Sequence, residues 1–208
     1  RNEAITFACA ALATKGSINI LQTDPKIIKT FLDTIAKMGA KVDAGKDEVT
    51  VSWQKQLTAI DIATGPEPGF MTDWQAIFSV LLTQAIGVSN VIERVYPSRF
   101  QHLAFLNQMG AKTQTYNPKI ANPGVYYEFN LDTDKAEYFH AVKIYGPVKL
   151  KAANLSINDL RAGACVTLAA LTALGESTID NVEYIESGYE KLADRLCSLG
   201  ANIKYIKT

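Results

Sequence analysis

A threefold internal repeat restricts this chain to folds built from three similar units. Each repeated segment has an apolar stretch long enough for a helix, then a glycine, then a β-branched run that favours a strand. The three segments read TFACAALATKGSINI, AIFSVLLTQAIGVSNVIE and GACVTLAALTALGESTIDNVE. The expected helices are Phe7–Ala13, Ile77–Ile86 and Cys165–Leu174, and the expected strands are Ser17–Leu21, Ser89–Glu93 and Ser177–Asn181.

A second, amphipathic helix follows in every unit and ends in the same Gly-Ala pair. Its three versions read IIKTFLDTIAKMGAKV, RFQHLAFLNQMGAKT and YEKLADRLCSLGANI. A left-handed glycine is expected to end each helix, because glycine adopts that conformation without a Cβ penalty. These glycines are Gly16, Gly87 and Gly175 after the first helices and Gly39, Gly110 and Gly200 after the second. Another strand is expected after each second helix, and further strands at Glu48–Trp53 and Val142–Tyr145.

The spacing of the glycines reveals an insertion in the second unit. Gly39 and Gly110 are 71 residues apart, whereas Gly110 and Gly200 are 90 apart. We place the extra residues at Asn117–Phe139, which is rich in Pro, Asn, Asp and Tyr, as a surface loop or hairpin. Within it, Val125–Leu131 is the expected strand. The units then cover residues of about 1–67, 68–157 and 158–208.

A unit of two helices and a small sheet cannot bury both helices alone, so the three units are expected to pack into one domain. The predicted class is α/β (α+β). The three most apolar helices lie in its centre and the sheets lie outside, which inverts the usual barrel. The repeat period of roughly 70 residues excludes a leucine-rich solenoid, whose units have about 20 to 29 residues.

Composition excludes several classes of partner. Lys plus Arg equals Asp plus Glu at 21 each, so no overall field attracts nucleic acid or a membrane surface, and local cations must bind any anionic ligand. Cys9, Cys165 and Cys197 lack CxxC or Cys/His spacing and are interpreted as small core residues. With only two histidines, neither metal nor cofactor is expected, and His102 is interpreted as a polar helix residue. The absence of a long apolar run favours the cytoplasm.

Three charged residues stand at or near expected helix starts. Asp73 follows a Pro/Gly loop and precedes an apolar helix, where it is either an ordinary N-cap, with Thr72 as the alternative cap, or a functional carboxylate. Arg161 is a cation at a helix start, which indicates an anionic ligand or a carboxylate partner, and Asp159 could orient it. Arg99 has a fork that suits a carboxylate but could equally be a solvated surface residue.

Four phrases resemble one family. They are PGFMTDWQA, RVYPSRFQHLAFLNQMGA, NDLRAGA and GYEKLADRLCSLGA. Their order and spacing are similar to those of the enolpyruvyl transferases, and the resemblance covers the chain outside Asn117–Phe139. It implies one of two domains that close over the substrates as an inside-out barrel. The chain enters a helix directly after Arg1, so we expect it to be the C-terminal half of a longer polypeptide whose N-terminal domain is a partner.

The resemblance also implies a reaction and its residues. Enolpyruvate would pass from phosphoenolpyruvate to an acceptor, which the phrases identify as UDP-N-acetylglucosamine rather than the alternative, shikimate 3-phosphate. It implies Asp73 as the general base and Arg99 with Arg161 as the phosphoenolpyruvate-binding pair. Further substrate contacts are implied for Thr72, Val95, Tyr96, Asp159, Arg1 and Glu3.

Ser187 departs from the family pattern, which has an arginine immediately before GYE. Loss of one cation from an ionic clamp weakens anion binding. This departure keeps open a second alternative, a nucleotide-sugar binding module without catalysis. The acid that protonates the substrate is implied to belong to the N-terminal domain, so the 208 residues alone are expected to be inactive.

Overall fold

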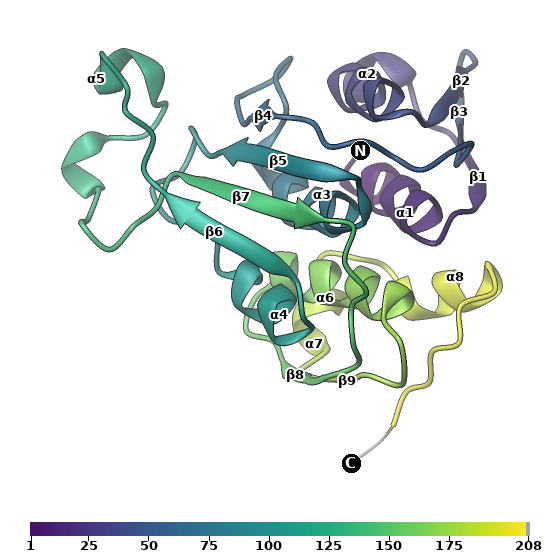
Figure 1. Ribbon diagram of the computed structural model, residues 1–208. Helices are drawn as coiled ribbons and strands as arrows, with labels where there is room; N and C mark the ends of the chain where they lie inside the picture. Colours follow the sequence, from purple (N-terminus) through teal and green to yellow (C-terminus); the bar gives the residue numbers. More distant parts are fainter. Residues whose placement is uncertain (207–208) are drawn as a thin grey trace.

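The computed structural model describes residues 1–206 and places the three repeated helices against one another in the centre (Figure 1). These helices are α1 (Asn2–Ala13), α3 (Thr72–Gln84) and α6 (Leu160–Thr172). Most residues of each helix are buried on every side, as expected of helices that are apolar all round. The predicted arrangement of central helices with outer sheets is confirmed.

The first two units carry outer sheets of the same design. In the first, β3 (Glu48–Ser52) pairs antiparallel with both β1 (Ser17–Leu21) and β2 (Lys41–Ala44). In the second, β7 lies between β5 and β6 in the same way, and the short β4 pairs parallel with β5. The bounds in the second unit are β4 (Ile62–Ala63), β5 (Gly87–Ile92), β6 (Lys112–Tyr116) and β7 (Ala141–Gly146).

The second helices of the units lie outside the central three. The turn η1 (Pro25–Ile28) leads into α2 (Lys29–Met38) in the first unit, and α4 (His102–Gln108) packs against both β6 and α6 in the second. The third unit has α7 (Glu183–Glu186) and α8 (Leu192–Ser198). Apolar residues of α2 at helical spacing, such as Phe31 and Ile35, are fully buried, which explains why this helix packs on the core.

The third sheet lacks a middle strand among residues 1–206. Only β8 (Asn154–Ser156) and β9 (Thr178–Asp180) pair, in parallel. The strand predicted after Gly200 is absent, since residues 201–206 follow α8 without joining a sheet. In the other units that strand pairs with β3 or β7, and a strand forms only where a neighbour satisfies its backbone groups.

Half of the glycine predictions are correct. Gly39, Gly110 and Gly200 are left-handed directly after the second helices. The helices α3 and α6, however, already end at Ala85 and Ala173, which are extended. Gly87 and Gly175 are left-handed two residues later, in the segment that leads from each helix into the next strand. Gly16 is not left-handed; its neighbour Lys15 takes that role with φ 61°.

The β6–β7 insertion, residues 117–140, replaces the short turn at residues 45–47 of the first unit and projects from the body (Figure 1). The strand predicted at Val125–Leu131 is wrong. The segment holds the helical turns α5 (Pro123–Tyr126) and η2 (Leu131–Thr133), because Pro123 is favourable in a first helical turn and Asn130 caps the second. The rings of Tyr127 and Phe129 pack against His140 at 5.0 and 5.2 Å.

The cysteine prediction holds for two of three residues. Cys9 in α1 and Cys165 in α6 are buried, and burial raises the pKa of both thiols. Cys197 is exposed, since α8 turns it away from the core, and its Sγ lies 3.3 Å from the carbonyl oxygen of Ile203. Within residues 1–206, every helix is too short or too polar to cross a membrane.

The buried His102 predicts an acid-sensitive fold. Its Nε2 lies 3.1 Å from Ser79 Oγ between α4 and α3, and burial lowers its pKa from 6.5 to about 4. The unfolded chain therefore binds a proton at higher pH than the folded chain does. Stability from this residue is complete above pH 6.5 and declines as the pH falls toward 4, by up to about 3 kcal/mol. Urea unfolding between pH 7.5 and 4.5 measures this loss.

A His102→Gln variant serves as the control, since it lacks the titrating group. Its free energy of unfolding should change less over the same pH range. An identical pH dependence in both proteins would assign the acid sensitivity to other residues.

Candidate active site

The first turns of the three central helices are tied together at one end of the molecule. Trp74 Nε1 of α3 donates to Asn2 Oδ1 of α1 at 3.1 Å. Arg161 Nε of α6 donates to Asp73 Oδ1 of α3 at 2.9 Å. The positive ends of three helix dipoles therefore converge, which favours an anionic ligand at this end.

Asp73 lies between two arginines. Its Oδ1 is 2.9 Å from Arg161 Nε and 3.9 Å from a terminal nitrogen of Arg99. The N-cap of α3 is Met71, with no side-chain cap, so the interpretation of Asp73 or Thr72 as an ordinary cap is wrong. The structure thus brings the three residues predicted to be catalytic together from three separate segments.

The two arginines are held differently. Arg99 precedes α4, its side chain is only 12% exposed, and its guanidinium lies 3.9 Å from the ring centroid of Tyr96. That stacking fixes the plane of the guanidinium. The Arg161 side chain is 44% exposed and is held by Asp73. The pair therefore combines one fixed cation with one that can leave its carboxylate for a ligand.

Asp159 acts on the backbone of α6 rather than on a guanidinium. Its Oδ1 accepts from the backbone N–H groups of Arg161 and Ala162 at 2.9 and 3.0 Å, which makes it the N-cap. The expectation that it orients the Arg161 side chain is wrong, because the carboxylate of the residue directly before a helix reaches the free N–H groups of the first turn. Asp159 therefore holds the backbone at Arg161, and Asp73 sets the direction of the Arg161 side chain.

The remaining predicted contact residues all have partners within the chain. Arg1 pairs with Glu67, and Glu3 accepts from Arg195 at 3.0 Å. Thr72 Oγ1 donates to Glu93, and the backbone N–H groups of Val95 and Tyr96 donate to the same carboxylate. Ser187, at the end of α7, donates to the carbonyl oxygen of Tyr184 at 2.7 Å.

Glu93 is the residue that the sequence analysis missed. Its side chain is completely buried at the end of β5, beneath the loop that carries Tyr96 and Arg99. One signal for it was available: in an alternating strand Glu93 shares the inward face with Ser89 and Val91, both fully buried. A carboxylate on that face requires buried donors.

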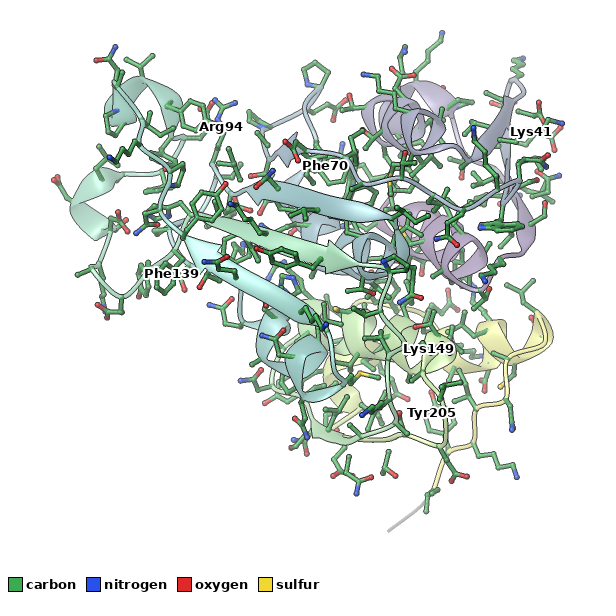
Figure 2. All side chains as sticks on the ribbon, in the orientation of Figure 1. Lys41, Phe70, Arg94, Phe139, Lys149 and Tyr205 are labelled. Atoms are coloured by element: carbon green, nitrogen blue, oxygen red, sulfur yellow. The ribbon has the colours of Figure 1, made fainter. Side chains whose placement is uncertain are left out.

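The β6–β7 insertion contacts the same loop through Arg94, which lies between the insertion and the body of the domain (Figure 2). Arg94 Nε donates to the Tyr126 carbonyl oxygen at 2.8 Å, and its guanidinium lies 4.6 Å from the Tyr126 ring centroid. Arg94 also pairs with Glu128 at 3.1 Å. The insertion is therefore anchored one residue away from Val95.

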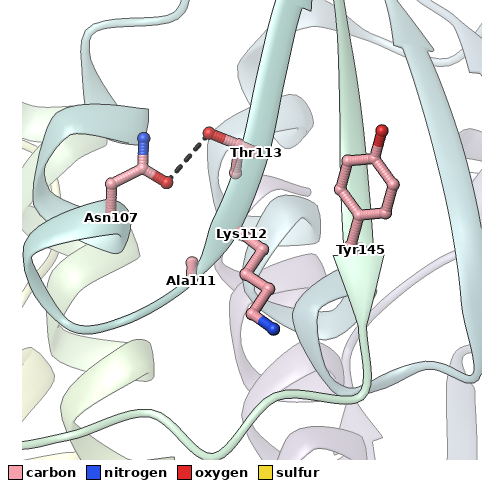
Figure 3. Close-up of a pocket in the computed structure, with 5 residues that line it drawn as sticks. All are labelled: Asn107, Ala111, Lys112, Thr113 and Tyr145. Atoms are coloured by element: carbon pink, nitrogen blue, oxygen red, sulfur yellow. Dashed lines mark hydrogen bonds between the residues drawn. The ribbon is translucent and has the colours of Figure 1, made fainter.

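Two surface hollows lie apart from these residues. One, of 580 Å³, is lined by residues of α4, β6 and β7 (Figure 3), namely Asn107, Ala111, Lys112, Thr113 and Tyr145. The other, of 300 Å³, lies at the C-terminal ends of α1 and α3, beside Leu12 and Gln84. Neither includes Asp73, Arg99 or Arg161. No three His, Cys, Asp or Glu side chains cluster as metal ligands in the described part of the chain.

The chain is similar to known proteins over nearly its whole length. It is 37% identical to UDP-N-acetylglucosamine 1-carboxyvinyltransferase of Pelagibacter ubique (strain HTCC1062) over 99% of this chain and 44% of the relative. It is 36% identical to UDP-N-acetylglucosamine 1-carboxyvinyltransferase 2 of Listeria monocytogenes serotype 4b (strain F2365), over 98% and 43%. The chain thus spans less than half the length of these relatives.

The chain is also similar to solved structures of two transferases. The enolpyruvyl transferase NikO from Streptomyces tendae matches with a TM-score of 0.78 and 26% identity, over 98% of this chain and 43% of that one. An EPSP synthase from Acinetobacter baumannii shares the fold, with a TM-score of 0.66 and 16% identity over the same shares. A model of the family "EPSP synthase (3-phosphoshikimate 1-carboxyvinyltransferase)" matches residues 1–196. The resemblance seen in the sequence is confirmed, and the chain belongs to this family of enolpyruvyl transferases.

Proposed function

We propose that this chain forms the C-terminal half of an enzyme that transfers enolpyruvate from phosphoenolpyruvate to the 3-hydroxyl of UDP-N-acetylglucosamine. The observation that carries the proposal is the Asp73 carboxylate between Arg161 and Arg99 at the convergent helix ends. The named relatives support the choice of acceptor. The product would enter peptidoglycan precursor synthesis in the cytoplasm.

The chemistry assigns one role to each charged group. Asp73 accepts the proton of the sugar hydroxyl as the hydroxyl oxygen bonds to C2 of phosphoenolpyruvate. C3 gains a proton in the same step, and a tetrahedral intermediate forms. The arginines bind the substrate carboxylate and phosphate. The C2–O bond to phosphate then breaks, phosphate leaves, and C3 loses a proton to restore the double bond. Thr72, Val95, Tyr96, Asp159, Arg1 and Glu3 remain proposed substrate contacts.

A second domain of the same polypeptide completes this proposal. We assign residues 1–208 to one domain and the proton donor for C3 to its partner. One observation supports a further segment here: the third sheet lacks the middle strand that β3 and β7 supply elsewhere. By this proposal the 208 residues alone bind substrates weakly and do not turn over.

Phosphate release by the full-length polypeptide tests the proposal. Release should require both phosphoenolpyruvate and UDP-N-acetylglucosamine, and a Ser187→Arg variant should bind phosphoenolpyruvate roughly tenfold more tightly, since a cation is added to the clamp. Kinetic measurement of KM for each substrate in both proteins provides the comparison.

Other results would select the alternatives. Phosphate release with shikimate 3-phosphate as the acceptor would favour the activity for which the matching family model is named. Binding of UDP-N-acetylglucosamine without any release, in both proteins, would favour the non-catalytic binding module. Turnover by the isolated 208 residues would refute the assignment of the proton donor to a partner domain.

A further inference from the structure

We propose that Glu93 is a positioning residue that fixes Asp73 and Arg99 relative to each other. The inference rests on the proposed function and deepens it. Glu93 touches neither of these two side chains and is completely buried. It acts instead through the two segments that carry them, the first turn of α3 and the loop of residues 94–99.

Five donors from separate segments converge on this carboxylate. Oε1 accepts from Thr64 Oγ1 at 2.9 Å and from the backbone N–H groups of Val95 and Tyr96 at 2.7 and 3.1 Å. Oε2 accepts from Thr72 Oγ1 at 2.8 Å and Gln75 Nε2 at 2.7 Å. None of these donors is a cation, so hydrogen bonds rather than a salt bridge compensate the buried charge.

The Oε2 side of the network holds the start of α3. Thr72 is the residue before Asp73, and Gln75 lies two residues after it, so two hydrogen bonds bracket the proposed base. Because α3 has no side-chain cap, these bonds hold its first turn together with the Trp74 bond to Asn2 and the Arg161 bond to Asp73 itself. The direction of the Asp73 carboxylate thus depends on Glu93.

The Oε1 side holds the loop that carries Arg99. The two backbone bonds turn the chain at Val95 and Tyr96, and the Tyr96 ring then stacks under the Arg99 guanidinium at 3.9 Å. Thr64 connects the same oxygen to the next residue, since its Oγ1 also accepts from the Arg94 backbone N–H at 2.8 Å. The Glu93 carboxylate therefore sets the positions of both Asp73 and Arg99, between which the substrate would react.

Only a carboxylate fits this set of donors. Two oxygens offer about four lone-pair sites and no hydrogen, whereas a glutamine amide would point two N–H groups at other donors on one side. In Glu93→Gln, an amide nitrogen that faces Val95 and Tyr96 loses both backbone bonds, and one that faces Thr72 and Gln75 keeps its bonds only if both partners reverse to accept. The expected result is a loosened loop or first turn rather than an unfolded protein.

The test compares Glu93→Gln with Val91→Ala in the full-length protein. Val91 is a fully buried residue on the same strand and face, so its truncation removes packing but none of these hydrogen bonds. We expect Glu93→Gln to lower kcat by about 100-fold, since small misplacements of reacting groups have effects of this size. Amide hydrogen exchange should be about tenfold faster either at Val95 and Tyr96 or at Trp74 in the first turn of α3, according to the side that the amide nitrogen faces, which matches loss of one hydrogen bond. Val91→Ala should retain near-normal kcat and amide protection.

Two results would overturn the proposal: wild-type exchange at Val95, Tyr96 and Trp74 alike in Glu93→Gln, or an equal loss of kcat in Val91→Ala. If Glu93→Gln does not fold, Gln75→Leu removes one Oε2 bond alone and should lower kcat while Val95 and Tyr96 stay protected. Unchanged kcat in that variant likewise contradicts the proposal. If the unaltered protein releases no phosphate, the proposed function fails, and amide exchange still decides the role of Glu93.

Discussion

Replacement of Asp73 by asparagine in the full-length protein is expected to lower the rate of phosphate release by about 1000-fold. General base catalysis contributes roughly 100- to 10,000-fold, and an amide of the same shape cannot accept the hydroxyl proton. The same change removes the negative charge that now engages Arg161 at 2.9 Å. Phosphoenolpyruvate should therefore bind at least as tightly as in the unaltered protein, which separates a loss of catalysis from a loss of binding.

Steady-state phosphate release and calorimetric titration measure the two effects. Asp24→Asn is the matched control, because Asp24 also lies at a helix start, where it caps η1, and asparagine caps equally well. It should leave both quantities unchanged. Rapid turnover by the Asp73→Asn protein would assign the base to another residue.

Replacement of Arg161 by methionine is expected to raise the dissociation constant of phosphoenolpyruvate by about 30-fold or more. Truncation of one partner of a buried, hydrogen-bonded charge pair weakens binding by about 2 to 5 kcal/mol. The lower end of that range applies to Arg161, whose side chain is 44% exposed before a ligand covers it. Methionine keeps much of the apolar stem, so the change removes mainly the guanidinium. Asp73 would also lose its 2.9 Å partner. Arg161→Lys should recover only part of the affinity, since an ammonium group lacks the planar fork.

Arg195→Met provides the comparison for Arg161. The two side chains have the same exposed fraction, 44%, and each pairs with one carboxylate. Calorimetry should show an affinity for phosphoenolpyruvate close to that of the unaltered protein in Arg195→Met. Equal losses in both variants would indicate a general effect of removed positive charge rather than a binding site at Arg161.

The central helices could be predicted from the sequence because their signal is local. A segment such as Phe7–Ala13 is apolar on every side, and burial is the only stable environment for such a helix. The left-handed conformation of Gly39 could likewise be predicted, because a glycine after an amphipathic helix favours that conformation by itself. The convergence of Asp73 and Arg161 follows from the repeat, since both stand in the first turn of equivalent helices.

What could not be predicted depends on contacts between distant segments. Thr64 and Thr72 lie 29 and 21 residues from Glu93, and no local pattern shows that their hydroxyl groups meet it. The strand expected at Val125–Leu131 failed for a related reason: β-propensity reflects packing on a neighbouring strand, and none lies beside this segment in the described structure. Asp159 was assigned to the wrong partner because capping is decided by backbone geometry.

The pairing of Tyr116 with Ala141 in the β6–β7 ladder shows how the second unit can carry extra residues beside the loop of residues 94–99. Since these two residues face each other, a connection of any length can join them without shifting the strand register. The loop is roughly eightfold longer than its counterpart in the first unit, which raises the entropy lost on loop closure by only about 2 kcal/mol. The aromatic cluster and the Arg94 contacts can offset a penalty of that size. A change in the length of this hairpin would therefore alter the surroundings of the loop of residues 94–99 at a small cost in stability, without moving the buried central helices.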